Sequence, residues 1–257
     1  MITADEVRDL IVRQDADRPR SKQVTLGPSD LGSPCARKLA YKLLGVEPVT
    51  ATDVNLAAWV GTGIHAQMEL ALKAENKRAK RRVWEVELPL RIDLGEGRAI
   101  PCHVDAYNVD RATAIDWKSV GPSALSKYKA NTPDNYATQI DLYGLALVLS
   151  GRRVEHVGIG YIPRNGDLKD IHVVTWEWTG ERADAAIKRY EALLSATAAG
   201  PAVLPLLPTA ADCRFCPWWA PGSDDPTTAC PGMPSQNPRG QLPPWNPEET
   251  AQEKAST

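Results

Sequence analysis

The stretch RAIPCHVDAYNVDRATAIDWKSVG, residues 98–121, decides the predicted fold. Two short apolar-leaning runs flank a polar turn at 108–111, and the Asn and Asp in that turn favour a tight hairpin. We therefore predict two adjacent antiparallel strands. Alternate side chains of a strand share a face, so Asp116 and Lys118 point the same way, and Asp105 on the neighbouring strand can reach them.

Two carboxylates and an ammonium group on one strand face are costly to bury without partners. A divalent metal ion supplies such a partner, because hard cations prefer oxygen ligands. A solvated strand face is the plain alternative for an isolated Asp-x-Lys pattern. The motifs around the stretch decide between the two interpretations.

Composition limits the classes of function. The 257 residues, 43% of them hydrophobic, suit one domain with a peripheral extension. No apolar run is long enough to span a membrane and the N-terminus lacks a signal pattern, so we expect a cytoplasmic protein. A net charge of −2 argues against a generally basic nucleic-acid coat, so DNA binding needs a local patch. The sequence contains no GxxxxGK[ST] phosphate loop, which argues against an ATPase.

Other elements follow from periodicity and turn residues. We predict helices at 3–13, 34–45, 54–79, 135–151 and 180–198, and further strands at 83–94, 154–164 and 170–178. In the first helix, Thr3 and Glu6 form a predicted capping box. Glu85 and Glu87 share one face of the first strand and are expected to face solvent. Residues 121–134 are polar and are expected to form a loop.

Four short motifs follow one another in the order of a known nuclease family. Asp105 followed by Ile-Asp-Trp-Lys at 115–118 resembles the PD-(D/E)XK signature. Gly-Thr-Gly-Ile-His at 61–65 resembles the Gly-x-x-x-His segment of its RecB-type branch, and Gln139 with Tyr143 resembles the branch's Gln-x-x-x-Tyr motif. The chain thus resembles RecB-type nucleases, which include the CRISPR-associated iron–sulfur exonucleases and phage relatives. Each motif also has a purely structural interpretation, but their order on the expected elements favours the nuclease.

The resemblance implies a restriction-endonuclease-like α/β fold, a mixed sheet flanked by helices, over roughly residues 28–232. It implies that Mg²⁺ or Mn²⁺ is bound by His65, Asp105, Asp116 and the backbone carbonyl of Trp117. Such an ion polarises a phosphodiester oxygen and acidifies a bound water.

The same resemblance implies roles for the remaining motif residues. Lys118 is expected to orient the attacking water and to stabilise developing charge. Gln139 and Tyr143 are expected to position Lys118 or the scissile phosphate. Cys102 stands where the family often has glycine, and we interpret it as a core cysteine.

Five cysteines are unevenly spaced, and in a cytosolic chain a cluster of them indicates metal more than disulfides. Cys213 and Cys216 form a C-x2-C pair, and Cys230 precedes a proline, as occurs around iron–sulfur clusters. Iron–sulfur members of the family carry one cysteine before the nuclease core, in a Cys-x-Arg segment like that of Cys35, and three after it. The resemblance therefore implies a 4Fe–4S cluster on Cys35, Cys213, Cys216 and Cys230, with Zn²⁺ as the alternative.

Candidate DNA contacts are basic or aromatic side chains. A solvated helix end or an ordinary loop is the plain alternative for most of them. The candidates are Arg37, Tyr41, Lys77, Arg78, Lys80, Arg81, Arg82, Lys127 and Tyr128.

These patterns divide the chain into an N-terminal helical segment (1–53), a nuclease core (54–199), a cysteine segment (200–232) and a Pro-rich tail expected to be disordered (233–257). The predicted function is a metal-dependent exonuclease on single-stranded or frayed DNA, in recombination, repair or CRISPR-type processing. Its expected partners are DNA and proteins of such machines. Two alternatives stay open: a non-catalytic DNA-end binder, and a zinc-stapled interaction module.

Overall fold

The computed structural model describes residues 2–17, 25–50, 55–210, 213 and 216–233. The chain forms two compact units: unit 1 contains 1–33 and 52–195, and unit 2 contains 34–51 and 196–257. The predicted N-terminal segment is thus divided between the units, and the predicted disordered tail falls, apart from its first residue, outside the described residues. Among the helices of the described ranges, none has the length and apolar character that a membrane crossing requires.

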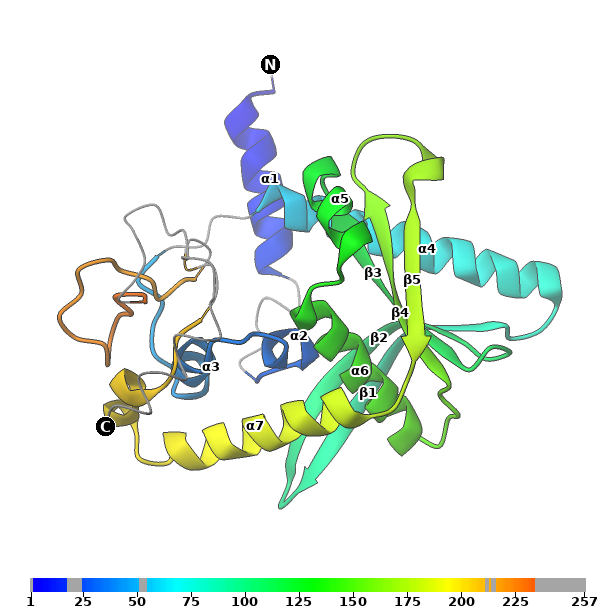
Figure 1. Cartoon of the computed structure of the whole chain (residues 1–257). Coiled ribbons are helices and arrows are strands. Elements are labelled where there is room, and N and C mark those ends of the chain that lie inside the picture. Colours follow the sequence, from blue (N-terminus) through cyan, green and yellow to red (C-terminus); the bar gives the residue numbers. More distant parts are fainter. Residues whose placement is uncertain (1, 18–24, 51–54, 211–212, 214–215, 234–257) are drawn as a thin grey trace. The chain divides into compact units, whose positions relative to one another are not determined.

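A mixed sheet forms the centre of unit 1, as predicted. The described strands are ordered β1-β2-β3-β4-β5, with β3 and β4 parallel and the other neighbours antiparallel (Figure 1). A parallel pair needs a crossover connection, and the helices between β3 and β4 provide it. The strands are β1 (Trp84–Gly95), β2 (Arg98–Asn108), β3 (Thr113–Val120), β4 (His156–Pro163) and β5 (His172–Glu177).

The helices of unit 1 agree with the predictions except at two places, since the short helix at 28–31 was not predicted and a predicted loop is helical. Thr3 and Glu6 form the predicted capping box at the start of the first helix. The predicted loop at 121–134 is wrong, because Pro122–Ala130 form α5, with Pro122 in the first turn and Leu125 buried. The described α-helices are α1 (Ala4–Ala16), α2 (Pro28–Leu31), α4 (Leu56–Ala79), α5, α6 (Asp134–Leu149) and α7 (Glu181–Thr197).

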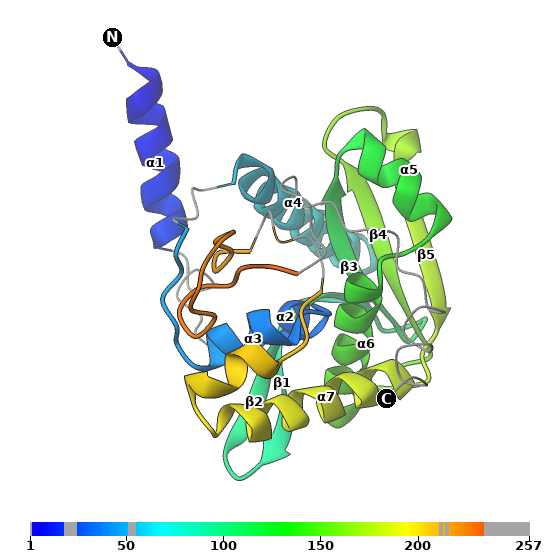
Figure 2. The ribbon, with the colours of Figure 1, turned by 60° about the vertical axis from the view of Figure 1, so that its left-hand side comes forward.

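Strand β3 carries different chemistry on its two faces. Ile115 and Trp117 pack in an apolar cluster with Leu72 of α4. Asp116, between them, accepts a hydrogen bond from Gln139 of α6. Because consecutive strand residues point to opposite faces, α4 and α6 cover opposite sides of β3 (Figure 2).

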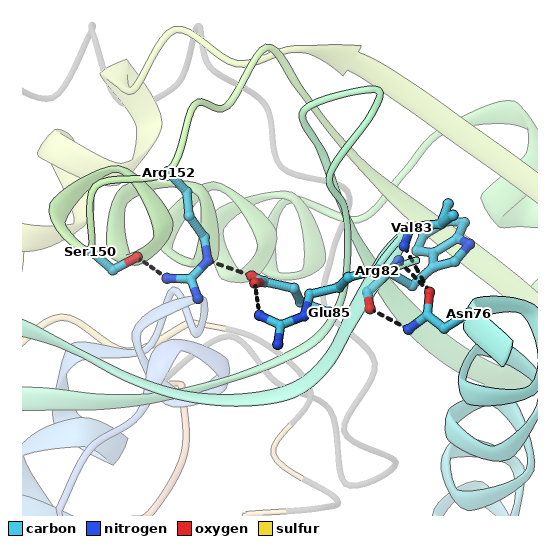
Figure 3. Close-up of polar contacts among 7 residues, drawn as sticks. Asn76, Arg82, Val83, Glu85, Ser150 and Arg152 are labelled. Carbon is cyan, nitrogen blue, oxygen red and sulfur yellow. Dashed lines mark hydrogen bonds and ion pairs between the residues drawn. The ribbon is translucent and has the colours of Figure 1, made fainter. Parts of the chain in front are cut away.

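Polar contacts anchor the start of β1 (Figure 3). The Asn76 side chain near the end of α4 accepts hydrogen bonds from the backbone N–H groups of Val83 and Trp84, at 2.8 and 2.9 Å. Glu85 lies 2.5 Å from Arg152 Nε, just after α6, and 3.3 Å from Arg82. The prediction that Glu85 faces solvent is therefore wrong, because its largely buried carboxylate joins β1 to the end of α6.

Unit 2 brings the early segment 34–51, which contains α3 (Ala36–Leu43), together with the segment that follows residue 195. Tyr41 stacks on Trp218 with ring centroids 5.6 Å apart, and its hydroxyl donates to the Pro226 carbonyl at 2.5 Å. Arg37 Nη2 donates to the carbonyls of Pro205, in the 3₁₀ helix η3 (Pro201–Leu206), and of Leu207.

These contacts correct one prediction. Tyr41 is fully buried. Its side chain therefore cannot contact DNA directly, and packing against Trp218 explains the residue. The guanidinium of Arg37 is also committed to carbonyls inside unit 2, so it serves that packing.

Candidate active site

The site lies where three neighbouring strands each place a carboxylate in line. Ala106 pairs with Ile115, so the next positions of the antiparallel register are Asp105 and Asp116. The backbone pairing of β2 with β3 ends at Ala106 and Ile115, and the Trp117 backbone N–H instead donates to Asp105 Oδ2 at 2.8 Å. A side-chain carboxylate thus replaces a backbone acceptor at this point, which draws Asp105 towards β3.

Asp116 and Lys118 share a face of β3, as their spacing predicted. Lys118 Nζ lies 2.7 Å from Asp116 Oδ2 and donates to Gln139 Oε1 at 2.8 Å. The Gln139 side-chain amide then donates to Asp116 Oδ1 and to the Tyr143 hydroxyl, both at 3.0 Å. One glutamine therefore orients both the carboxylate and the lysine, and Tyr143, one helical turn further on, contacts that glutamine.

The negative charge of the buried Asp116 carboxylate is only partly balanced by its neighbours. Its side chain is 1% exposed, and Oδ2 accepts no well-aligned hydrogen bond from the described residues, although the Lys118 ammonium is close. Burial raises the pKa of Asp116, the Lys118 charge acts against this effect and the Asp105 charge adds to it, and the resulting pKa is about 6. A buried carboxylate of this kind favours an added positive charge.

His65 reaches the same carboxylates from α4. Its Nδ1 lies 3.3 Å from Asp105 Oδ2, and this contact, acting against the effect of burial, raises the pKa of His65. Ligand atoms of His65, Glu87 and Asp105 all lie within 4.8 Å of one another. These atoms are close enough to share one metal ion.

Glu87 is the residue that sequence reasoning missed. Val86 pairs with Ala106 and Leu88 with Val104, so Glu87 stands across from Asp105. Its backbone is left-handed, with φ of 49°, where the regular ladder is interrupted. The prediction that Glu87 faces solvent is wrong.

The neighbouring side chains explain why Glu87 does not face solvent. Its side chain is 27% exposed and lies 3.0 Å from His103. Burial, followed by the charge of Asp105, raises its pKa. Glu87 therefore belongs to the same electrostatic group as Asp105.

The donor set fits a hard divalent cation. Glu87, Asp105 and Asp116 supply three carboxylates and Lys118 supplies one ammonium, which leaves two negative charges when His65 is neutral. Carboxylate oxygen with imidazole nitrogen suits Mg²⁺ or Mn²⁺ better than a thiophilic metal. The unsatisfied Asp116 Oδ2 is a further available oxygen.

Comparisons with known proteins agree with this fold. No protein-family model and no curated protein matches the sequence. The chain is similar to the crystal structure of SSO0001, at 15% identity and a TM-score of 0.55, over 85% of this chain and 95% of that one. At this identity the similarity concerns the fold alone.

Two further solved structures are similar at lower TM-scores. A phage-related exonuclease from Haemophilus somnus 129PT has 16% identity and a TM-score of 0.42, over 62% of this chain and 78% of that one. An alkaline exonuclease, LHK-Exo from Laribacter hongkongensis, has 15% identity and a TM-score of 0.47, over 73% and 93%. Exonucleases are thus among the structures that this chain resembles.

The predicted DNA contacts of unit 1 fall into two groups, at the end of α4 and on α5. The basic run ends α4, and the 14 residues from His65 to Ala79 span about 20 Å of helix. Each arginine of that run is paired with a carboxylate: Arg78 with Glu75, Arg81 with Asp110 and Arg82 with Glu85. Lys127 and Tyr128 lie on α5, directly after β3.

Four cysteines belong to unit 2: Cys35, Cys213, Cys216 and Cys230. None of these four cysteines forms a disulfide, and the pKa of Cys216 is raised by burial and then by the neighbouring Cys35 and Cys230. The Lys38 N–H lies 3.5 Å from Cys35 Sγ, and Arg37 Nη1 lies 3.8 Å from Cys230 Sγ.

The distances between these sulfurs bear on whether they could share a zinc ion. Sulfurs on one zinc ion lie within about 4 Å of one another, since Zn–S is about 2.3 Å. Among the described residues, no three of the cysteines show that spacing. Cys102, in contrast, is buried in unit 1, and burial raises its pKa to about 12, in agreement with a core cysteine.

Proposed function

We propose that this protein is a divalent-metal-dependent DNA exonuclease. The observation that carries the proposal is the line of Glu87, Asp105 and Asp116 across three strands, with Lys118 beside it. Two uncompensated negative charges at a largely buried site favour a dication. The adjacent ammonium favours a phosphate. Together these features suit metal-assisted hydrolysis of a phosphodiester bond.

Each residue then has a defined task. The ion would be held by His65, Asp105, Asp116 and the Trp117 carbonyl, with Glu87 as an additional ligand. A bound Mg²⁺ or Mn²⁺ polarises a phosphodiester oxygen and acidifies water.

The remaining groups prepare the attack on phosphorus. Lys118 orients the attacking water and stabilises the negative charge that develops on the phosphate. Gln139 holds the Lys118 ammonium and the Asp116 carboxylate in one arrangement. Tyr143 fixes the amide of Gln139.

We further propose that the substrate is single-stranded or frayed DNA with a free end, in recombination, repair or CRISPR-type processing. This part follows the resemblance of the motifs to RecB-type nucleases. The test compares linear single-stranded DNA with covalently closed single-stranded circles, in Mn²⁺ and in EDTA. Linear strands should disappear in Mn²⁺ while circles survive. Equal loss of both would indicate an endonuclease, and DNA binding without cleavage under any divalent metal would indicate a non-catalytic end binder.

We also propose that unit 2 binds a 4Fe–4S cluster through Cys35, Cys213, Cys216 and Cys230. The gathering of these four cysteines in one unit, and the N–H groups directed at two of the sulfurs, support it. Anaerobically purified protein should be brown and contain iron and acid-labile sulfide. Cys102→Ser should leave the iron content unchanged. Colourless protein with one zinc per chain would contradict the cluster.

A further inference from the structure

The Lys118 ammonium has a third neighbour, which the motifs do not include. Lys118 Nζ lies 4.8 Å from the centre of the Tyr136 ring, over its face. A cation over an aromatic face at this distance is attracted by the quadrupole of the ring. Tyr136 stands three residues before Gln139 on α6, so both side chains lie on one helix face and meet the same lysine.

The Tyr136 ring is itself held in place. Tyr128 of α5 packs edge-on against it with centroids 5.7 Å apart, and Tyr128 contacts Tyr161 of β4 at 5.5 Å. Tyr161 is fully buried, and its hydroxyl lies 3.3 Å from Thr132 Oγ1. Burial and a hydrogen bond with Tyr128 raise the pKa of Tyr136, so its hydroxyl stays protonated. The ring is therefore a fixed, neutral surface beside a flexible lysine.

A fixed surface matters because Lys118 has a long side chain and shares its carboxylate partner. Asp116 is its ion-pair partner and, in the proposed function, also a metal ligand. A dication competes with Lys118 for that carboxylate, whereas it does not compete for the face of Tyr136. The ring and the Gln139 oxygen then remain to hold the ammonium.

We propose that Tyr136 is a positioning residue for Lys118: its ring face holds the ammonium where the scissile phosphate and attacking water must meet it. The role rests on the proposed nuclease function and adds a residue outside the Gln-x-x-x-Tyr motif. Tyr136 acts through Lys118 and does not itself react. A contact of this type corresponds to roughly a 3- to 30-fold change in rate.

A double-mutant cycle tests the role through catalysis. Tyr136→Leu removes the ring and keeps an apolar side chain, and it should lower kcat roughly 3- to 30-fold with little change in KM. Tyr136→Phe keeps the ring face and should recover most of that loss. In a Lys118→Ala background, Tyr136→Leu should have almost no further effect, because the group it positions is gone. The proposal would be overturned if Tyr136→Leu lowered kcat equally in the Lys118→Ala background, or if Tyr136→Phe were as slow as Tyr136→Leu.

A second measurement does not depend on activity. Protons held over an aromatic face are shifted upfield by its ring current, so the Lys118 Cε protons should show such a shift in NMR spectra of lysine-labelled protein. Lys118→Ala identifies the signal. The shift should persist in Tyr136→Phe and vanish in Tyr136→Leu. A shift that survives in Tyr136→Leu would refute the contact, whereas a protein that shows the contact and cleaves no DNA would refute the nuclease function instead.

Discussion

The two units use contrasting donor chemistry. Unit 1 presents carboxylates and an imidazole on a regular sheet and a long helix, where backbone pairing fixes the positions of the side chains. Unit 2 presents four cysteines among short helices and irregular chain. A sheet can hold its ligands in place before any metal binds, whereas a small unit with little regular structure gains stability from a metal staple. We therefore expect substitutions in unit 1 to affect chemistry and those in unit 2 to affect folding.

The largest expected effect is at Asp116. Asp116→Asn keeps the shape of the side chain and removes its charge, so Mn²⁺-dependent cleavage should fall on the order of 100-fold or more. Lys118→Ala should be similarly damaging. DNA affinity should change far less, because phosphate contacts are spread over many basic groups. Single-turnover cleavage and DNA titrations measure both, and cleavage that persists in both variants would place the chemistry elsewhere.

The matching change in unit 2 is Cys216→Ser. It should abolish bound iron and lower the thermal midpoint of unit 2, since the binding energy of a structural metal contributes directly to folding. The midpoint of unit 1 should stay the same, with Cys102→Ser as the control for losing a buried thiol. Iron analysis and calorimetry distinguish these results. Unchanged iron in Cys216→Ser would show that the ligand set is wrong.

The buried Asp116 carboxylate in unit 1 predicts a pH dependence of the metal-free protein. Folding raises the pKa of Asp116 from its ordinary value near 3.8 to about 6, because the group is buried. Between these values the folded state holds a proton that the unfolded state has released, so stability falls as pH rises through this window. The loss is on the order of 3 kcal/mol.

The measurement compares chemical unfolding in EDTA at pH 4.5 and pH 7 for wild type and Asp116→Asn. Asp116→Asn should lack the part of the stability decrease that comes from ionisation of Asp116. Mn²⁺ should restore the stability of the wild-type protein at pH 7. The raised pKa of His65 acts with the same sign, because a protonated His65 stabilises the folded state below that pKa. Identical profiles for wild type and variant would mean that Asp116 is charged and compensated in the metal-free protein.

A smaller effect is expected behind the site, at Gly160 of β4. A Cβ there would lie 2.4 Å from the Trp117 ring, so Gly160→Ala should cost about 1–3 kcal/mol of unfolding free energy and displace Trp117. Gly63 is the matched control, because a Cβ on this helical glycine meets nothing within 4 Å. Gly63→Ala should be neutral or stabilising. Denaturant unfolding compares the two, and equal effects would contradict the packing argument.

The smallest expected effect concerns Glu87. Glu87→Gln removes one carboxylate from the donor set but leaves Asp105 and Asp116, so half-maximal cleavage should need about 10-fold more Mn²⁺. The maximal rate at saturating Mn²⁺ should change little. A metal titration of the cleavage rate measures this. A normal titration would assign Glu87 to its ion pair with His103 alone.

Local patterns in the sequence were sufficient for much of this molecule. The two-residue period of a strand places Asp116 and Lys118 on one face of β3. The four-residue spacing of Gln139 and Tyr143 places these two side chains on one face of α6. Most helices followed from periodicity in the same way, whereas the mixed sheet was implied by the resemblance to RecB-type nucleases. These predictions succeeded because each depends on residues close together in the chain.

Predictions failed where the position of a residue depends on a distant segment. Tyr41, a predicted DNA contact, is buried against Trp218, which lies far along the chain. The polarity of residues 121–134 indicated a loop, although Leu125 finds a buried site that stabilises α5. Burial of this kind is decided by tertiary packing and cannot be seen in local composition.

Glu87 shows where local sequence patterns stop predicting the site and tertiary structure becomes necessary. The sequence by itself determined the order of the motifs, the strands that carry them and the shared face of Asp116 and Lys118. The register of β1 against β2 shifts between Asp93 and Gly95, just before the turn, and a one-residue shift changes every cross-strand neighbour. The tertiary structure alone therefore decided that Glu87 stands opposite Asp105, because strand pairing is a long-range hydrogen-bonded arrangement that short-range periodicity does not encode.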